Sequence, residues 1–196
     1  MSLALRSSPP QWVVADEPDP GLVADLVEAT SLPTIVVRIL VNRGLTTTEA
    51  ISHFLNPDLA DLKDPFSMTG MEAGIDRVTQ ALYDNEKIMI YGDYDVDGIT
   101  ATSLLYQVLN KLGGQVDFYL PNRLTQGYGL SVDGIDKARD RGITLIITVD
   151  TGITAVDEVE YAREQGIEVV VTDHHEAGVA IPNAFAIINP KKPGCD

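Results

Sequence analysis

The chain has 196 residues, 44% of them hydrophobic, and a formal net charge of −15. This composition suits one hydrophobic core with a small second unit, and no apolar run reaches the roughly 20 residues that a transmembrane helix needs. A single cysteine, Cys195, excludes an internal disulfide, and the first residues lack the pattern of a secretory signal, so we expect a cytoplasmic protein with no membrane partner. The acidic charge argues against a polyanionic partner, unless bound cations reverse the charge locally.

Residues 1–70 are predicted to form a small helical N-terminal segment. Apolar residues recur at spacings of three and four between Pro18 and Leu62. Thr46 and Glu49 fit a capping box before a helix that Asn56-Pro57 ends. We interpret the segment as a helical cap in preference to an interaction or regulatory module, because it contains no cluster of catalytic residue types.

Residues 71–196 alternate between helix and strand, which predicts an α/β fold. The middle strands are continuous Val/Ile runs, typical of strands covered on both faces. Right-handed crossovers would then give a parallel, mainly five-stranded sheet with helices on both faces. The predicted strands are Lys87–Gly92, Gln115–Leu120, Thr144–Val149, Glu168–Thr172 and Ala184–Ile188, and the predicted helices are Met71–Asp84, Ile99–Leu112, Ser131–Arg141 and Ala155–Gln165.

Three of these strands end in acidic or imidazole side chains. Asp93, Asp95 and Asp97 follow the first strand, Asp150 follows the third, and Asp173-His174-His175 follow the fourth. Because the carboxyl ends of parallel strands meet at one edge of a sheet, these side chains should converge there. Carboxylates suit Mg²⁺ or Mn²⁺, and mixed carboxylate and imidazole ligation points to Mn²⁺. The sequence therefore predicts a metal-centred site at this edge.

Each motif taken alone has another interpretation. An acidic pair after a first strand also occurs in response-regulator receivers and in Asp-rich surface turns, and Asp150 could instead cap the following helix. Gly98 is expected to allow an unusual backbone angle in the acidic loop. His53 stands alone in a helix and is interpreted as structural. The metal site is favoured by the three strand ends together, not by any one of them.

Arg123 and Tyr128 are the candidates for holding a nucleic acid strand. They lie in the segment NRLTQGYG, residues 122–129. An arginine can bind a phosphate with two parallel hydrogen bonds, and a tyrosine face can stack on a base. The alternative is a glycine-rich surface loop without a binding role, and the sequence does not separate the two.

The motifs DYDVDG (93–98), VDTG (149–152) and DHH (173–175) resemble the first three motifs of the DHH phosphoesterase superfamily. Within it, YGDYDVDGITAT, PNRLTQGYGLS and TDHH are most similar to the RecJ-type exonucleases that are specific for single-stranded DNA. The leading segments LVNRGLTTTEAISHFLNP and DPFSMTGM fit the same family. The resemblance extends from about Pro33 to the last residue.

The resemblance implies a role for each residue at the predicted metal site. Asp95 and Asp97 would bind two different Mn²⁺ or Mg²⁺ ions, Asp150 would bridge the pair, and His174 would complete one coordination sphere. His175 would face the scissile phosphate. Asp93 and Asp173 would act from a second layer that orients the ligands.

The implied activity is two-metal hydrolysis of phosphodiesters, with 5′-to-3′ removal of nucleotides from single-stranded DNA in repair and recombination. A single-strand binding protein or a helicase is left open as a further partner. The family's fourth aspartate motif and second domain are not visible after His175, so we expect a fragment that folds but has poor activity and binds DNA weakly.

Two other functions remain open. The first is a DHH phosphoesterase acting on pyrophosphate, nucleotides or cyclic dinucleotides, which the acidic charge favours. Tyr91 disfavours it, because relatives with small substrates tend to have His at that position. The second is a catalytically inactive DHH scaffold subunit. It is disfavoured because every ligand expected before the last residue is present.

Overall fold

The computed structural model describes residues 11–122, 124 and 127–195, and these residues form two compact units that divide after Leu62. The sequence-based division after residue 70 stays a prediction. The predicted division assigns the 3-10 helix η2 (Pro65–Ser67) to the N-terminal segment, whereas the compact units place η2 in the second unit. Among the described residues, no helix combines the length and the apolar character needed to span a bilayer.

The first unit is helical, as the apolar spacing predicts, and its described residues form three α-helices. Its elements are α1 (Pro20–Thr30), α2 (Thr34–Asn42), α3 (Thr48–Leu55) and the 3-10 helix η1 (Leu59–Asp61). The helices pack through a small core of buried side chains, namely Val23, Leu26, Val37, Leu40 and Ile51. This core is separate from the two clusters of the second unit.

The N-terminal cap of α3 is Thr47, not Thr46 as the sequence suggested. Thr47 has an extended backbone, and its side chain accepts a hydrogen bond from the N–H of Ala50 at 3.1 Å. The helix begins one residue later than expected, so Thr47 in place of Thr46 satisfies one of its free N–H groups. Asn56 ends the helix as predicted.

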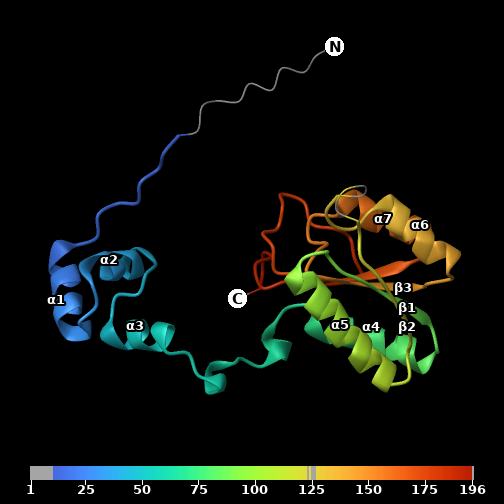
Figure 1. Ribbon diagram of the computed structural model, residues 1–196, viewed down its shortest axis with the longest axis horizontal. Helices are drawn as coiled ribbons and strands as arrows, with labels where there is room; N and C mark the ends of the chain where they lie inside the picture. The colour runs from blue at the N-terminus through green and yellow to red at the C-terminus, as the bar shows by residue number, and fades with distance from the viewer. Residues whose placement is uncertain (1–10, 123, 125–126, 196) are drawn as a thin grey trace, which may run out of the picture. The chain divides into compact units, whose positions relative to one another are not determined.

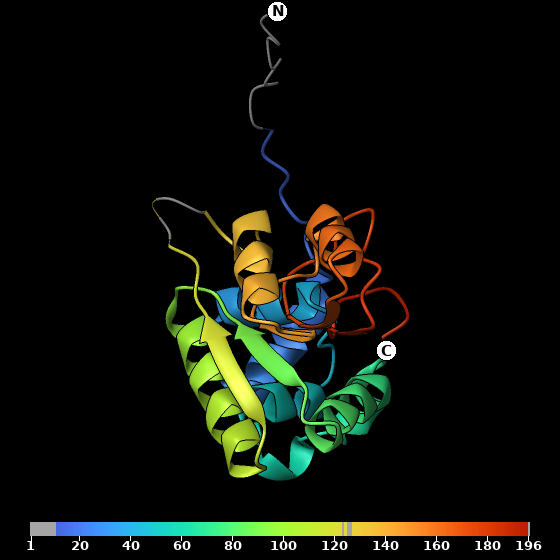
Figure 2. The same cartoon turned by 90° about the vertical axis from the view of Figure 1, so that its right-hand side faces the viewer.

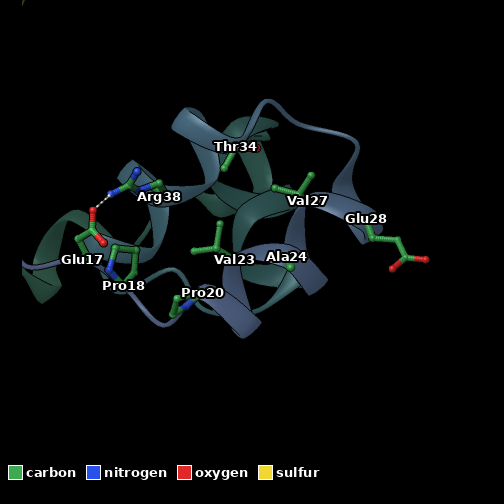
Figure 3. A pocket seen from close by; sticks show the side chains of 9 residues that line it. All are labelled: Glu17, Pro18, Pro20, Val23, Ala24, Val27, Glu28, Thr34 and Arg38. Carbon is green, nitrogen blue, oxygen red and sulfur yellow. Dashed lines mark hydrogen bonds and ion pairs between the residues drawn. The ribbon is translucent and has the colours of Figure 1, made fainter.

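A hollow of about 500 Å³ lies between α1 and α2 (Figure 3). Val23 and Val27 line it from α1, and Arg38 of α2 forms an ion pair with Glu17 at 2.8 Å. Glu28, the other carboxylate there, points away from Glu17 (Figure 3). The hollow therefore does not bring carboxylates together as a metal site would.

The second unit is a five-stranded parallel sheet with strand order β2-β1-β3-β4-β5, so the predicted fold is confirmed. The strands are β1 (Lys87–Tyr91), β2 (Gln115–Tyr119), β3 (Leu145–Val149), β4 (Glu168–Thr172) and β5 (Ala186–Ile188). The helices are α4 (Met71–Tyr83), α5 (Val96–Lys111), α6 (Val132–Asp140) and α7 (Val156–Glu164). Helices α4 and α5 cover one face of the sheet, and α6 and α7 cover the other (Figures 1 and 2).

Alternate residues of each strand fill two separate cores. In β1, Met89 and Tyr91 belong to the cluster that contains Ile135 and Val159 of the α6–α7 face. Ile88 and Ile90 belong to the other cluster, on the α4–α5 face. Because both faces of the sheet are covered, the buried stretches of β1, β3 and β4 are almost entirely apolar, which explains the Val/Ile runs. The strand order places β3 between β1 and β4, so the three motif-bearing strands are adjacent.

Helix α5 begins at Val96, three residues earlier than predicted, because Asp95 caps it. The Asp95 carboxylate accepts hydrogen bonds from the N–H groups of Asp97 and Gly98, both at 3.0 Å. Gly98 is not among the described glycines with positive φ, so the expected unusual angle is wrong. Its small size is needed instead, since a Cβ there would lie 2.6–2.8 Å from backbone atoms of Asp93.

Ion pairs tie the amino ends of the strands to α4. Arg77 is only 10% exposed and pairs with Glu86 at 2.7 Å and with Glu168 at 2.5 Å. Glu86 also accepts a hydrogen bond from the hydroxyl of Thr144 at 2.6 Å. The hydrogen bond from Arg77 lowers the pKa of Glu86 below its ordinary value. These contacts lie at the opposite edge of the sheet from the motifs.

We predict that Glu86→Gln lowers the free energy of unfolding at pH 7 by about 1–3 kcal/mol, because it weakens charge-assisted hydrogen bonds. The pKa of Glu86 is lower in the folded protein than in the unfolded chain, where it is near 4.5. The ionised Glu86 therefore stabilises the fold above pH 4.5, and this stabilisation is lost as the pH falls through the pKa of the folded state. Urea unfolding from pH 7 to pH 3.5 should show the two proteins converging. Glu164→Gln, at an exposed position of α7, is the control; a pH-independent difference for Glu86→Gln would contradict the account.

Candidate metal centre

The structure brings the acidic and imidazole motifs to the carboxyl edge of the sheet. Asp93 is 2% exposed, whereas Asp95 and Asp97 are exposed at the start of α5. Asp150 is 9% exposed at the end of β3. His174, after β4, has a side chain that is 58% exposed. The strand ends thus combine buried carboxylates with groups open to solvent.

Two groups of potential ligands occur among the described residues, and Asp150 belongs to both. In the first, ligand atoms of Asp93, Asp95 and Asp150 all lie within 4.8 Å of one another. In the second, the same holds for Asp150, His174 and His175. One group offers only carboxylate oxygens and the other offers one carboxylate and two imidazoles. Each donor set fits Mn²⁺, and the first also fits Mg²⁺.

Asp150 is held in a backbone conformation that few residues adopt. Its φ is 60°, in the left-handed region, which costs a non-glycine residue ~1–3 kcal/mol. Its N–H donates to the carbonyl of Thr172 at 3.1 Å, and its Oδ1 lies 2.8 Å from His174 Nε2. Burial raises the pKa of Asp150, and the contact with His174 acts in the opposite direction. The turn therefore holds a partly desolvated carboxylate against an imidazole.

The Asp173 carboxylate accepts several hydrogen bonds from the segment that carries the two histidines and from Ile153. Asp173 is 8% exposed and accepts from the N–H groups of Ile153 (2.9 Å), His174 (2.7 Å) and His175 (3.1 Å). Burial would raise the pKa of Asp173, but these backbone hydrogen bonds lower it overall. Its Oδ1 is 2.7 Å from His175 Nδ1, and this contact raises the pKa of His175. Asp173 is thus placed to orient the imidazole, as an indirect role requires.

Asp97 and Asp93 differ in how closely they approach the other ligands. Asp97 is in neither ligand group of the described residues; it lines an open hollow of about 420 Å³ together with Asp150, Asp173 and His174. Asp93, which the sequence placed in a second layer, lies within ligand distance of Asp95 and Asp150. His175, expected to face the substrate, has a ligand atom within 4.8 Å of ligand atoms of both Asp150 and His174, so it too could bind a cation.

Arg123 lies outside the described residues, whereas Tyr128 reaches the site. The Tyr128 hydroxyl donates to the carbonyl oxygen of Asp150 at 3.0 Å. Its ring meets the rings of Tyr94 and His175 edge-on, with centroids 6.3 and 5.8 Å away. Burial raises the pKa of Tyr128 to about 12, so the hydroxyl keeps its proton. Sequence reasoning missed Tyr94; its place between two motif aspartates was the available signal.

Residues 87–196 match the family described as "DHH family, N-terminal domain". The chain belongs to the DHH family. It is 47% identical over 191 residues to the single-stranded-DNA-specific exonuclease RecJ of Bacillus subtilis, an alignment that covers 97% of this chain and 24% of the relative. The RecJ of Escherichia coli is 37% identical over 167 residues, covering 84% of this chain and 28% of that protein.

Two solved structures share the fold. An exonuclease RecJ bound to manganese has a TM-score of 0.63 and 32% identity over 68% of this chain and 34% of that one. RecJ from Thermus thermophilus in complex with Mn²⁺ has a TM-score of 0.61 and 26% identity, over 92% of this chain and 25% of that one. The chain spans about a quarter of the length of the curated relatives it matches.

We predict that Gly98→Ala displaces the acidic loop, because its new Cβ would collide with the Asp93 backbone. Overpacking of this kind costs about 1–3 kcal/mol, which should lower the melting temperature and weaken Mn²⁺ binding measured by calorimetry. Gly21→Ala, where the Cβ would make an ordinary 3.4 Å contact, is the matched control. Equal Mn²⁺ affinity in Gly98→Ala and the unmodified chain would show that close approach at Gly98 does not shape the site.

Proposed function

We propose that this chain is the metal-binding part of a phosphodiesterase that removes nucleotides from single-stranded DNA in the 5′-to-3′ direction. The observation that carries the proposal is the sharing of Asp150 between two groups of potential ligands. A carboxylate common to two groups is what a pair of neighbouring cations requires, and such pairs serve phosphoryl chemistry in nucleases and phosphatases.

The residues divide into those that would hold cations and those that would orient them. Asp95, Asp150 and His174, which belong to the two ligand groups, would hold two Mn²⁺ or Mg²⁺ ions together with Asp97, which is in neither group but lines the same hollow as Asp150 and His174. Asp93 is close enough to support Asp95 directly, and Asp173 holds the His175 ring. When bound, the cations supply positive charge that favours ionisation of a water and neutralises charge developing on the phosphoryl oxygens.

His175 is the group we assign to the scissile phosphate. Its side chain is 46% exposed, so it can meet a substrate while its Nδ1 stays against Asp173. The contact with Asp173 raises the pKa of His175, and the imidazolium form can donate its Nε2–H to a phosphate oxygen while Nδ1–H stays on Asp173. Asp173 would thus act through His175 without touching the substrate.

The net charge of −15 constrains where a nucleic acid could bind. Clustered carboxylates repel phosphates, so approach to this edge depends on the bound cations, which reverse the local charge. DNA binding by this chain should accordingly depend on Mn²⁺ or Mg²⁺.

The choice of substrate rests on the names of the relatives. The similar proteins from Bacillus subtilis and Escherichia coli are described as single-stranded-DNA-specific exonucleases. From the family resemblance we assign repair and recombination as the setting and a single-strand binding protein or a helicase as a candidate partner, and the single cysteine favours the cytoplasm as the location. The acidic charge favours a second candidate, a phosphoesterase acting on pyrophosphate or nucleotides.

A comparison of substrates separates these functions. The intact protein that carries this chain is supplied with Mn²⁺ and with a 5′-labelled single strand, the matching duplex, a cyclic dinucleotide or pyrophosphate. We expect mononucleotides released from the single strand only. Turnover of the small substrates alone would establish the second candidate, and no turnover together with no Mn²⁺ binding would indicate an inactive scaffold.

We predict that Asp150→Asn lowers single-strand cleavage by more than about 100-fold and weakens Mn²⁺ binding, because the shared ligand loses its charge. Asparagine tolerates a φ of 60°, so the fold should persist, and its melting temperature checks this. Asp25→Asn, at an exposed position of α1, is the control. Full cleavage by a folded Asp150→Asn protein would contradict the assignment.

A further inference from the structure

We propose that Tyr128 is a positioning residue, whose hydroxyl fixes the Asp150 backbone and the His175 ring in the arrangement that the cations and substrate require. This inference rests on the proposed function of the same site. It assigns Tyr128 a role through its hydroxyl, whereas contact with a DNA strand would use its ring.

The hydroxyl of Tyr128 contacts two loops that are distant in sequence. It donates to the carbonyl oxygen of Asp150, 22 residues away, at 3.0 Å. It also lies 3.3 Å from Nδ1 and 3.4 Å from Nε2 of His175, 47 residues away. One oxygen atom therefore joins the loop after β3 to the loop after β4.

The available protons determine how these contacts work. A phenol has a single proton, and a carbonyl oxygen can only accept, so the Tyr128 proton goes to Asp150. The phenol oxygen then has no proton left to donate to His175. The carboxylate of Asp173, 2.7 Å from Nδ1, also only accepts, so Nδ1 carries a proton. The Nδ1–H is therefore directed to Asp173, and the phenol oxygen, nearly equidistant from the two ring nitrogens, contacts the ring itself and limits its rotation.

The contact with Asp150 acts on its left-handed backbone. At a φ of 60° the Asp150 peptide needs support from its surroundings. Its N–H is held by the carbonyl of Thr172, and its own carbonyl is held by Tyr128. With both polar groups fixed, the carboxylate is directed to its position 2.8 Å from His174.

The ring of Tyr128 is itself held by neighbouring rings. Tyr94 packs against it at an interplanar angle of 83° and His175 at 78°. Edge-to-face contacts of this kind are favourable and fix ring orientation. Tyr128 is nevertheless 51% exposed, so part of its ring could stack on a base. Positioning needs the hydroxyl and stacking needs the ring, so two substitutions separate the roles.

The test compares Tyr128→Phe, which keeps the ring, with Tyr128→Leu, which removes it. For Tyr128→Phe we expect kcat on a single-stranded oligonucleotide to fall by about tenfold with KM nearly unchanged, and Mn²⁺ affinity of the 196-residue chain to fall by a similar factor. Tyr83→Phe removes a hydroxyl from a side chain that is 82% exposed on α4 and should change neither quantity. Melting temperatures establish that each variant folds.

The proposal is overturned if Tyr128→Phe matches the unmodified protein in kcat and Mn²⁺ affinity. If, in that case, KM rises only in Tyr128→Leu, the role of Tyr128 is base stacking. A second measurement combines Tyr128→Phe with His175→Gln: we expect a loss in kcat smaller than the product of the two single losses. If the unmodified intact protein does not cleave single strands, the proposed function fails, and Mn²⁺ binding by the Tyr128→Phe chain still tests the positioning role.

Discussion

Repulsion among carboxylates at the carboxyl edge of the sheet is the constraint on which the rest of the site depends. Asp93 and Asp150 are almost fully buried, and their oxygens lie within 4.8 Å of each other and of Asp95. Like charges at this distance are unfavourable unless protons, hydrogen bonds or cations compensate them. This repulsion is concentrated at the edge of the sheet where parallel strands usually bind ligands. Divalent cations bound there would attract each carboxylate and outweigh the repulsion among them.

The backbone, more than side-chain packing, directs these carboxylates. β3 lies between β1 and β4, so Asp150 emerges between the other two motifs. The small size of Gly98 lets α5 start against the Asp93 backbone, and Asp95 caps that helix while still facing the site. The Arg77 ion pairs hold the opposite edge. The site is therefore built on strand ends and helix starts, which are rigid supports.

The sheet and its ligand edge could be predicted because the signals are local. Val/Ile runs mark β3 and β4, and the acidic motifs follow them directly. Boundaries failed where a side chain decides them: Asp95 moves the start of α5, and Thr47 replaces Thr46 as a cap. The link from Tyr128 to Asp150 and His175 could not be predicted, since no local pattern records contacts over 22 and 47 residues.

The most direct test of the shared-ligand account is a crystal structure of this chain grown with Mn²⁺, with the ions located by anomalous scattering. The account predicts two Mn²⁺ peaks about 3.5–4 Å apart, one on each side of the Asp150 carboxylate and each in contact with it. Peaks elsewhere on the chain, or a single ion bound without Asp150, would contradict it.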